Sequence, residues 1–170
     1  DTAVTERPDA EQLAAIALRS AQFARWMGLE PRVAFISYTT FGNPPGVHIE
    51  ELRGAVKLLD GIKCDFEYEG EMGPDVALNY DAQRRFYPFS RLSGPANILV
   101  MPGLQSASLS AKLLRALGEE SVLGPYLLGL QHPVQIAPMT ASASDLVMLA
   151  VLAAGDAHAR QQREKARAPA

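Results

Sequence analysis

The segment from Phe86 to Gly118 constrains the fold more than any other part of the sequence. It places a short apolar run, Asn97 to Met101, before a Pro-Gly turn, a serine-rich segment and an amphipathic stretch. This order predicts a buried strand that turns directly into a helix. In open α/β folds, ligands bind where the carboxyl end of a strand meets the amino terminus of the next helix. The segment therefore predicts an α/β fold and marks one candidate ligand site.

Strand and helix patterns alternate along the rest of the chain. The run from Arg32 to Ser37 is apolar, as in parallel strands that are buried on both faces. Phe66 to Glu71 alternates strictly, which predicts a strand nearer an edge of the sheet. Residues 123–136 are apolar pieces broken by glycine and proline, so the pattern indicates strands there only weakly. We expect an α/β sheet with right-handed crossovers. The expected helices are Asp9–Met27, about Ile49–Asp60, Asp75–Phe86, about Ser108–Leu117 and a last helix capped by Ser142 or Ser144.

Composition narrows the class of protein. Hydrophobic residues make up 48% of the chain and charged residues 21%, which is typical of a globular protein. The net charge of −3 gives no basic footprint and argues against a nucleic-acid partner. The single cysteine, Cys64, excludes an internal disulfide framework and favours a reducing, cytoplasmic location. The apolar stretches at 96–101 and 146–154 are too short to span a bilayer, so we expect no membrane partner.

Two polar segments follow the predicted strands. The first comes directly after the Arg32–Ser37 strand, where α/β proteins place ligands, and it is either a site or an ordinary loop. The second, from Ser106 to Ser110, is either a helix N-cap or an anion cradle in which hydroxyls and backbone N–H groups hold a phosphate. Lys112, one turn further, would add positive charge. The candidate residues are Ser37, Thr39, Thr40, Gly42, Asn43, Ser106, Ser108, Ser110 and Lys112.

For the other residues with reactive or charged side chains, a structural interpretation is favoured over a functional one. Glu67, Glu69 and Glu71 share one face of the alternating strand, which favours a solvated face, although Glu71 and Asp75 could line a cleft at the strand's end. The histidines, His48, His132 and His158, lack neighbours at metal-ligand spacing, so we expect no metal site in this chain. Cys64 lies beside Lys63 and Asp65 and is interpreted as a half-buried bystander. The chain has neither a Gly-Lys-Ser phosphate loop nor a G-x-G-x-x-G motif.

Four blocks, taken in order, resemble the phosphate acetyl/butyryltransferase family. They are most similar to the C-terminal phosphotransacetylase-like domain of bacterial hybrid NADP-dependent malic enzymes. The tetrad Pro88 to Arg91 is particularly like the malic-enzyme version, in which Phe-Pro-Phe-Ser-Arg-Leu precedes Ala-Asn-Val-Leu. The blocks are Pro31–Gly42, Tyr68–Leu78, Tyr87–Leu104 and Ala111–Val134.

The resemblance implies a three-layer α/β/α fold with a mostly parallel sheet. The chain would be the second lobe of a phosphotransacetylase-like (isocitrate/isopropylmalate dehydrogenase-like) fold, over residues 1–158, followed by a polar tail over residues 159–170 that frays. The helix within residues 137–158 would pack on the missing first lobe. Since the chain starts at Asp1, we expect it to be cut from a longer protein. The malic-enzyme region, with NADP and a divalent metal (Mg or Mn), would lie upstream, so this chain itself needs no cofactor.

The chain departs from the family at its chemistry. The family's Ser-Arg-Gly loop serves coenzyme A and acyl phosphate, but here Pro138 and Met139 stand in place of the serine and arginine, and only the downstream aspartate, Asp145, remains. Without the arginine, the bidentate phosphate partner is lost. The asparagines of the family's Pro-Asp-Leu-Asn loop are also replaced, by Gly103, Gln105 and Ser108. We therefore expect no catalytic residues in this chain.

Three functions remain open from the sequence. The favoured one is a regulatory module that binds acetyl-CoA or a related acyl-CoA through the two polar segments, Lys112 and Asp145, and acts on malate oxidation in the same protein. The second is a working phosphate acyltransferase. The third is a dimerisation scaffold that uses Leu113, Leu114, Leu117 and the apolar stretch 126–128. The resemblance implies a homo-oligomer, so the first and third can coexist.

Overall fold

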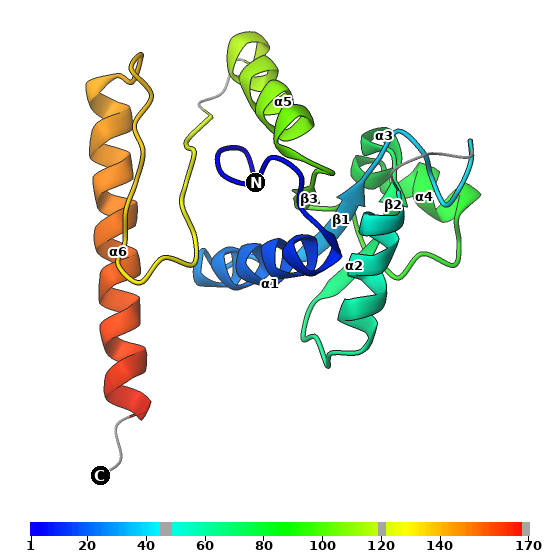
Figure 1. Ribbon diagram of the computed structural model, residues 1–170, viewed down its shortest axis with the longest axis horizontal. Coiled ribbons are helices and arrows are strands. Elements are labelled where there is room, and N and C mark those ends of the chain that lie inside the picture. Colours follow the sequence, from blue (N-terminus) through cyan, green and yellow to red (C-terminus); the bar gives the residue numbers. More distant parts are fainter. Residues whose placement is uncertain (45–48, 119–121, 168–170) are drawn as a thin grey trace. The chain divides into compact units, whose positions relative to one another are not determined.

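The chain builds a parallel α/β sheet between helices. The computed structural model describes residues 1–44, 49–118 and 122–167. Its strands β1 (Arg32–Ile36), β2 (Glu67–Met72) and β3 (Ile98–Val100) are parallel and lie in the order β2-β1-β3. Figure 1 labels the helices, which are α1 (Ala10–Trp26), α2 (Glu50–Asp60), α3 (Pro74–Leu78), α4 (Tyr80–Phe86), α5 (Leu104–Leu117) and α6 (Ala143–Arg167).

The central strand β1 separates two apolar clusters. Val33 and Phe35 point into a cluster with α1, α2 and Val100, whereas Ala34 and Ile36 point into the opposite cluster with Met72 and the α3 residues. Alternate residues of one strand thus face different helical layers, as the pleat requires. The continuous apolar character of β1 is explained, and the expected three-layer α/β/α fold with a parallel sheet is confirmed.

Individual residues determine where α1 begins and how closely α2 packs against it. Asp9 accepts a hydrogen bond from the Gln12 amide at 2.8 Å, and the Gln12 side chain accepts one from the Asp9 amide at 3.0 Å, which forms a capping box. In α2, Gly54 leaves room for α1, since a Cβ at this position would lie 2.8 Å from the Cβ of Ala10. The glycine inside α2 is therefore needed for packing.

The observed elements differ from the predicted ones in three places. The expected helix Asp75–Phe86 is two short helices, because the Asn79 side chain accepts from the Ala82 amide at 3.0 Å and starts α4 afresh. Helix α5 begins at Leu104, not near Ser108. The described part of residues 123–136 holds no strand, only an isolated bridge between Tyr126 and Gln135.

The structure divides into two compact units, Asp1–Lys112 and Leu113–Ala170. This boundary lies well before the end of the single lobe expected over residues 1–158. In the second unit, residues 122–135 run along α6: the Tyr126 hydroxyl donates to the Leu152 carbonyl at 3.3 Å, and Arg160 donates to the carbonyls of Leu130 and Gln131. The tail expected to fray from residue 159 continues α6 to Arg167. Across the described residues, the helices fall short of the length and apolar character needed to cross a bilayer.

Candidate functional site

The predicted loop after β1 folds into a tight turn over Thr40–Asn43. The amide of Thr40 donates to the Asn43 carbonyl, and the amide of Asn43 donates to the Thr40 carbonyl, both at 3.1 Å. The two central residues have left-handed backbones, with φ of +50° at Phe41 and +83° at Gly42. Glycine adopts this conformation readily, but a bulky residue such as Phe41 does so only where its surroundings hold it.

The hydroxyls of this loop face inward. Ser37, Thr39 and Thr40 are buried, and the Ser37 and Thr39 hydroxyls lie 3.2 Å apart. Thr40 Oγ1 accepts from the Gly73 amide at 2.9 Å, which ties the loop to the end of β2. Gly42 is half-buried and Asn43 is exposed. Of the five loop residues that the sequence singled out, the three hydroxyl-bearing ones thus build the loop from inside.

Glu71 is the buried charge beneath the turn, and its side chain is 2% exposed. Its carboxylate accepts from the Gly42 amide at 2.7 Å and, in a two-point ion pair, from Nε and Nη2 of Arg53 at 2.9 and 3.0 Å. Burial alone would raise the pKa of Glu71, but the hydrogen bonds from Arg53 and from backbone amides outweigh it and lower the pKa. Glu71 is therefore held as a carboxylate at the carboxyl end of β2.

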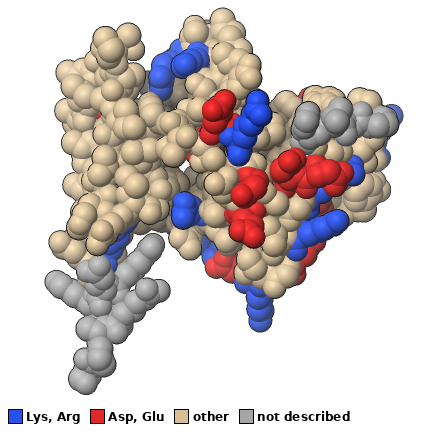
Figure 2. All heavy atoms as spheres, in the orientation of Figure 1, with Lys and Arg blue, Asp and Glu red and all other residues tan. Residues whose placement is uncertain are grey.

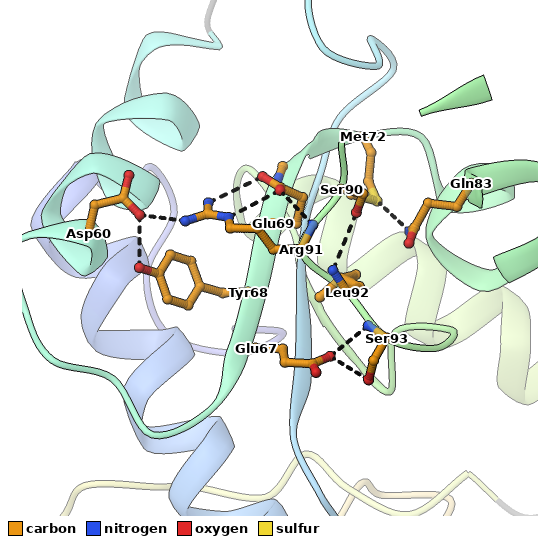
Figure 3. A network of polar contacts seen from close by, with 11 residues as sticks. Asp60, Glu67, Tyr68, Glu69, Met72, Gln83, Ser90, Arg91, Leu92 and Ser93 are labelled. Carbon is orange, nitrogen blue, oxygen red and sulfur yellow. Dashed lines mark hydrogen bonds and ion pairs between the residues drawn. The ribbon is translucent and has the colours of Figure 1, made fainter. Parts of the chain in front are cut away.

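A second ion pair holds the segment around Arg91 on the same strand (Figure 3). Arg91 donates to Glu69 through Nε at 3.1 Å and Nη2 at 3.2 Å and to Asp60 through Nη1 at 2.6 Å, and its guanidinium stacks 4.5 Å from the centre of the Tyr68 ring. The Arg91 hydrogen bond is also the main reason that the pKa of Asp60 is lowered. At the start of the same strand, Glu67 accepts from the amide and hydroxyl of Ser93 at 2.8 and 3.0 Å.

These contacts correct the prediction of a solvated glutamate face. Glu69 and Glu71 are 6% and 1% exposed, and each is paired with an arginine. A parallel strand is covered on both faces, so its polar residues must find partners inside the protein. Asp75, the other candidate for a cleft at the end of β2, is exposed on α3.

Replacing Tyr68 by phenylalanine should reduce the loss of stability at alkaline pH. Burial, followed by the hydrogen bond to Asp60 at 2.8 Å, raises the pKa of Tyr68 to about 12. A raised pKa means that the neutral phenol stabilises the fold below the unfolded value of about 10 and that this contribution is lost as the pH rises towards 12. Urea unfolding of both proteins between these pH values measures the difference. Equal slopes of stability against pH would contradict the coupling.

The serine-rich segment lies inside a helix, which corrects the expectation of a loop. Since α5 starts at Leu104, Ser106, Ser108 and Ser110 fall in its first two turns, and Lys112 is more than two turns from its start and exposed. At the helix start, the Leu104 amide donates to the Glu6 carbonyl at 3.1 Å, and the Ser106 hydroxyl donates to the Gly103 carbonyl at 2.9 Å. An anion cradle here would have to do without these two donors, and Lys112 would add little to it.

Asp145, the remaining predicted residue, belongs to the second unit. Its carboxylate accepts from the amide and the hydroxyl of Ser142, both at 2.8 Å, and Ser142 Oγ accepts from the Asp145 amide at 3.2 Å. Ser142 is thus the cap of α6, one of the two serines predicted for it. The bonds from Ser142 lower the pKa of Asp145. In the structure Asp145 serves as the capping partner of Ser142.

A small hollow of about 50 Å³ lies beside this cap. Pro138 and Asp145 line it together with Arg115, whose Nη2 donates to the Gly124 carbonyl at 2.8 Å. Met139 is fully exposed. The hollow holds a few waters at most, so a ligand as large as an acyl-CoA would meet this unit on its surface. The other residues around the hollow are Val122, Leu123, Gly124, Thr140, Ala141 and Leu149.

The remaining candidates are Cys64 and the histidines. Cys64 is partly buried, its thiol donates to the Leu59 carbonyl at 3.7 Å, and burial raises its pKa, as expected of a bystander. Within the described ranges, no three His, Cys, Asp or Glu side chains come together to hold a metal ion. His48 lies outside the described residues.

Two arginines were missed by the reading of the sequence. Arg53 stands in the middle of α2 and belongs to no motif, whereas Arg91, in the irregular segment before β3, entered only as part of the tetrad that carries the resemblance, with no role assigned to it. Their carboxylate partners are 18 and 22 residues away, so only the tertiary structure reveals the pairs. The available signal was the alternation of glutamates in a strand that was predicted to lie in a parallel sheet.

Comparisons with known proteins find similarity to phosphate acetyltransferases and to NADP-dependent malic enzymes. The family described as "Phosphate acetyl/butaryl transferase" matches residues 1–154. The NADP-dependent malic enzyme of Rhizobium meliloti (strain 1021) is 54% identical over 157 residues, which are 92% of this chain and 20% of that protein. The phosphate acetyltransferase of Bacillus subtilis (strain 168) is 32% identical over 92% of this chain and 49% of its own length.

Solved structures agree with this family. A phosphotransacetylase from Streptococcus pyogenes superimposes with a TM-score of 0.85 at 32% identity, over 92% of this chain and 48% of its own. The present chain therefore spans about a fifth of the Rhizobium meliloti malic enzyme and about half of the Bacillus subtilis phosphate acetyltransferase and of the Streptococcus pyogenes phosphotransacetylase.

Proposed function

The chain belongs to the phosphate acetyl/butaryl transferase family, and from this premise we propose that it is a regulatory domain of an NADP-dependent malic enzyme that binds acetyl-CoA or a related acyl-CoA. The parent reaction would be the oxidative decarboxylation of malate to pyruvate and CO₂. NADP and a divalent metal (Mg or Mn) would act in the rest of that protein. The domain itself would regulate this reaction without catalysing acyl transfer.

One observation carries the proposal: the same 92% of the chain matches malic enzymes and phosphate acetyltransferases, with the higher identity to the malic enzymes. A transferase-type domain linked to malate oxidation needs a use for its acyl-CoA site. Pro138 and Met139, where the resemblance places a serine and an arginine, argue against transfer to phosphate. A domain that binds acyl-CoA without converting it would use this site to regulate malate oxidation.

We rank the residues proposed for binding by their positions in the fold. The loop Ser37–Asn43 follows the central strand β1, and α5 follows the neighbouring parallel strand β3, so both emerge at the same edge of the sheet. We assign the loop, with Gly42 and Asn43 at its surface, as the main contact. Lys112, which is exposed on α5, and Asp145, which is half-buried at the start of α6, are further candidates.

The test is a titration of the intact protein with acetyl-CoA. We expect saturable binding by calorimetry and a change of about fivefold or more in the apparent affinity for malate, as is usual for an allosteric effector. Lys112→Ala and Asp145→Ala should weaken the response, whereas Lys57→Ala, an exposed lysine on α2, should not.

The outcomes separate the possible functions. No binding of acetyl-CoA would refute the regulatory proposal, and formation of acetyl phosphate from acetyl-CoA and phosphate would favour the transferase instead. Binding that survives both substitutions would refute only the assignment of Lys112 and Asp145.

Self-association is a compatible second role, which one observation favours. Leu113, Leu114 and Leu117 of α5 are 58%, 64% and 81% exposed, and large exposed apolar patches mark interaction surfaces. Figure 2 shows the visible surface over the described part of α6 mostly free of charged atoms, whereas positive and negative atoms are mixed over the first unit. On α6, Leu146, Val147 and Val151 are also at least 50% exposed. We propose that these faces support a homo-oligomer of the intact protein.

A further inference from the structure

We propose that Glu71 and Arg53 are positioning residues of the acyl-CoA site: together they hold the Thr40–Asn43 turn in the conformation that the ligand meets. This inference rests on the proposed function, because it concerns the same loop. It adds two residues, on β2 and α2, that the sequence pattern did not connect with the site.

The turn needs external support. Two successive left-handed residues, at φ +50° and +83°, make its centre, and the first of them is Phe41. A bulky residue persists in this region only when its surroundings determine its conformation. The Phe41 ring contributes by packing 5.3 Å from the Tyr87 ring and 4.8 Å from the Phe89 ring, centre to centre. Ring packing places the side chain but leaves the two central amides to be satisfied elsewhere.

Glu71 accepts a hydrogen bond from each of these two amides. Its backbone carbonyl accepts from the Phe41 amide at 2.9 Å, and its carboxylate accepts from the Gly42 amide at 2.7 Å. The Thr39 hydroxyl donates to the same carboxylate oxygen at 3.4 Å. One residue at the end of β2 thus binds three residues, Thr39, Phe41 and Gly42, of the loop that follows β1. Because β1 and β2 are neighbours in the sheet, this contact fixes the loop to the rigid core.

Arg53 completes the support from α2. Its Nε and Nη2 bind the two oxygens of Glu71, and a Cβ built on Gly42 would lie 3.0 Å from Nη2. The guanidinium therefore lies directly against the turn as well as against the carboxylate. The Arg53 side chain is 39% exposed while that of Glu71 is 2% exposed, so the pair runs from the core to the surface at the loop.

The chemistry of the pair requires a carboxylate. Both oxygens of Glu71 accept N–H donors, Oε1 from Gly42 and Arg53 and Oε2 from Arg53. A glutamine has one oxygen and one NH₂ group, so in either orientation its NH₂ would face an N–H donor. Glu71→Gln keeps the shape of the side chain but cannot satisfy the turn and Arg53 together.

The same strand offers a matched control. Glu69 is also buried, 8% exposed at its side chain, and it pairs with a half-exposed arginine, Arg91, at 42%. It holds the amide and side chain of Arg91 but makes no hydrogen bond to the Thr40–Asn43 turn. Glu69→Gln should therefore disturb the protein to a similar degree without reaching the loop.

The experiment measures acetyl-CoA affinity and hydrogen–deuterium exchange of the peptide over residues 37–43, both in the intact protein. We expect Glu71→Gln to weaken affinity by about tenfold or more, because an ordered loop binds with a smaller entropic cost, and to speed exchange in this peptide. Glu69→Gln should change affinity less than about twofold and leave the exchange of this peptide as in the wild type. Arg53→Lys should retain more affinity than Arg53→Met, since it keeps the charge.

Each outcome decides between the claims. Equal losses of affinity in the two glutamine variants would overturn the positioning role, because they would reflect general destabilisation. Unchanged affinity in Glu71→Gln would overturn it as well. If the wild-type protein binds no acetyl-CoA, the proposed function fails. The exchange data then decide whether Glu71 orders the turn: faster exchange only in Glu71→Gln upholds that part, and equal exchange rejects it.

Discussion

Replacing Gly70 by alanine is expected to lower the free energy of unfolding by about 3–5 kcal/mol, since it combines overpacking with backbone strain. Gly70 lies in the middle of β2 with φ of +150°, a region that glycine alone visits readily. A Cβ here would lie 2.7 Å from the Cβ and 2.8 Å from the carbonyl oxygen of Phe35 on β1. The collision involves backbone of the central strand, which cannot move without opening the sheet.

Gly28→Ala provides the control for this prediction. Gly28 also has a positive φ, +79°, but no atom lies within 4 Å of a Cβ at this position. Gly28→Ala should lower the free energy of unfolding by about 1 kcal/mol, because only the backbone strain of a positive φ contributes. Urea unfolding followed by circular dichroism measures both variants. If Gly70→Ala loses no more stability than Gly28→Ala, the prediction that a side chain at position 70 clashes with Phe35 is wrong.

Arg91→Met is expected to destabilise the protein by about 2–3 kcal/mol. The substitution leaves the buried carboxylate of Glu69 without its cation, and breaking a fully buried pair costs about 3–5 kcal/mol. We expect less here because the Arg91 side chain is 42% exposed and solvent screens the pair. Loss of the stacking on Tyr68 adds to the effect. The urea midpoint at neutral pH reports the change.

Two further variants test the cause of this loss. Arg25→Met removes a surface ion pair with Asp65, which is 76% exposed, and should cost less than about 1 kcal/mol. The double variant Arg91→Met/Glu69→Met should recover much of the stability, because it removes the orphaned buried charge. A double variant less stable than Arg91→Met would mean that Glu69 stabilises the fold through contacts other than the arginine.

Local patterns were sufficient to predict most elements of the fold. Helix α1 was visible from Asp9 and Gly28 at its ends, β1 from its unbroken apolar run, and β2 as an edge strand from its alternation. Each of these signals lies within a few residues of the element that it marks. The start of α5 was misplaced because the Glu6 carbonyl, far away in sequence, receives the amide of Leu104.

The position of the candidate site was predictable from the sequence, but the contacts that hold its loop were not. The rule that ligands bind at the carboxyl ends of parallel strands located the Ser37–Asn43 loop. It could not reveal that the hydroxyls of Thr39 and Thr40 turn inward, or that Glu71 lies beneath Gly42. Alternation in β2 was interpreted as solvent exposure, although a strand in a parallel sheet has no solvated face.

By itself, then, the sequence determined the α/β class, the family and the edge of the sheet where the loops gather, because periodicity, caps and motif order are written in neighbouring residues. The tertiary structure alone decided which charges are buried and what they hold. Glu71 meets Arg53 across 18 residues and Glu69 meets Arg91 across 22. Such pairs form only when the strands and helices have packed, since burial of a carboxylate is tolerated only where distant donors converge on it.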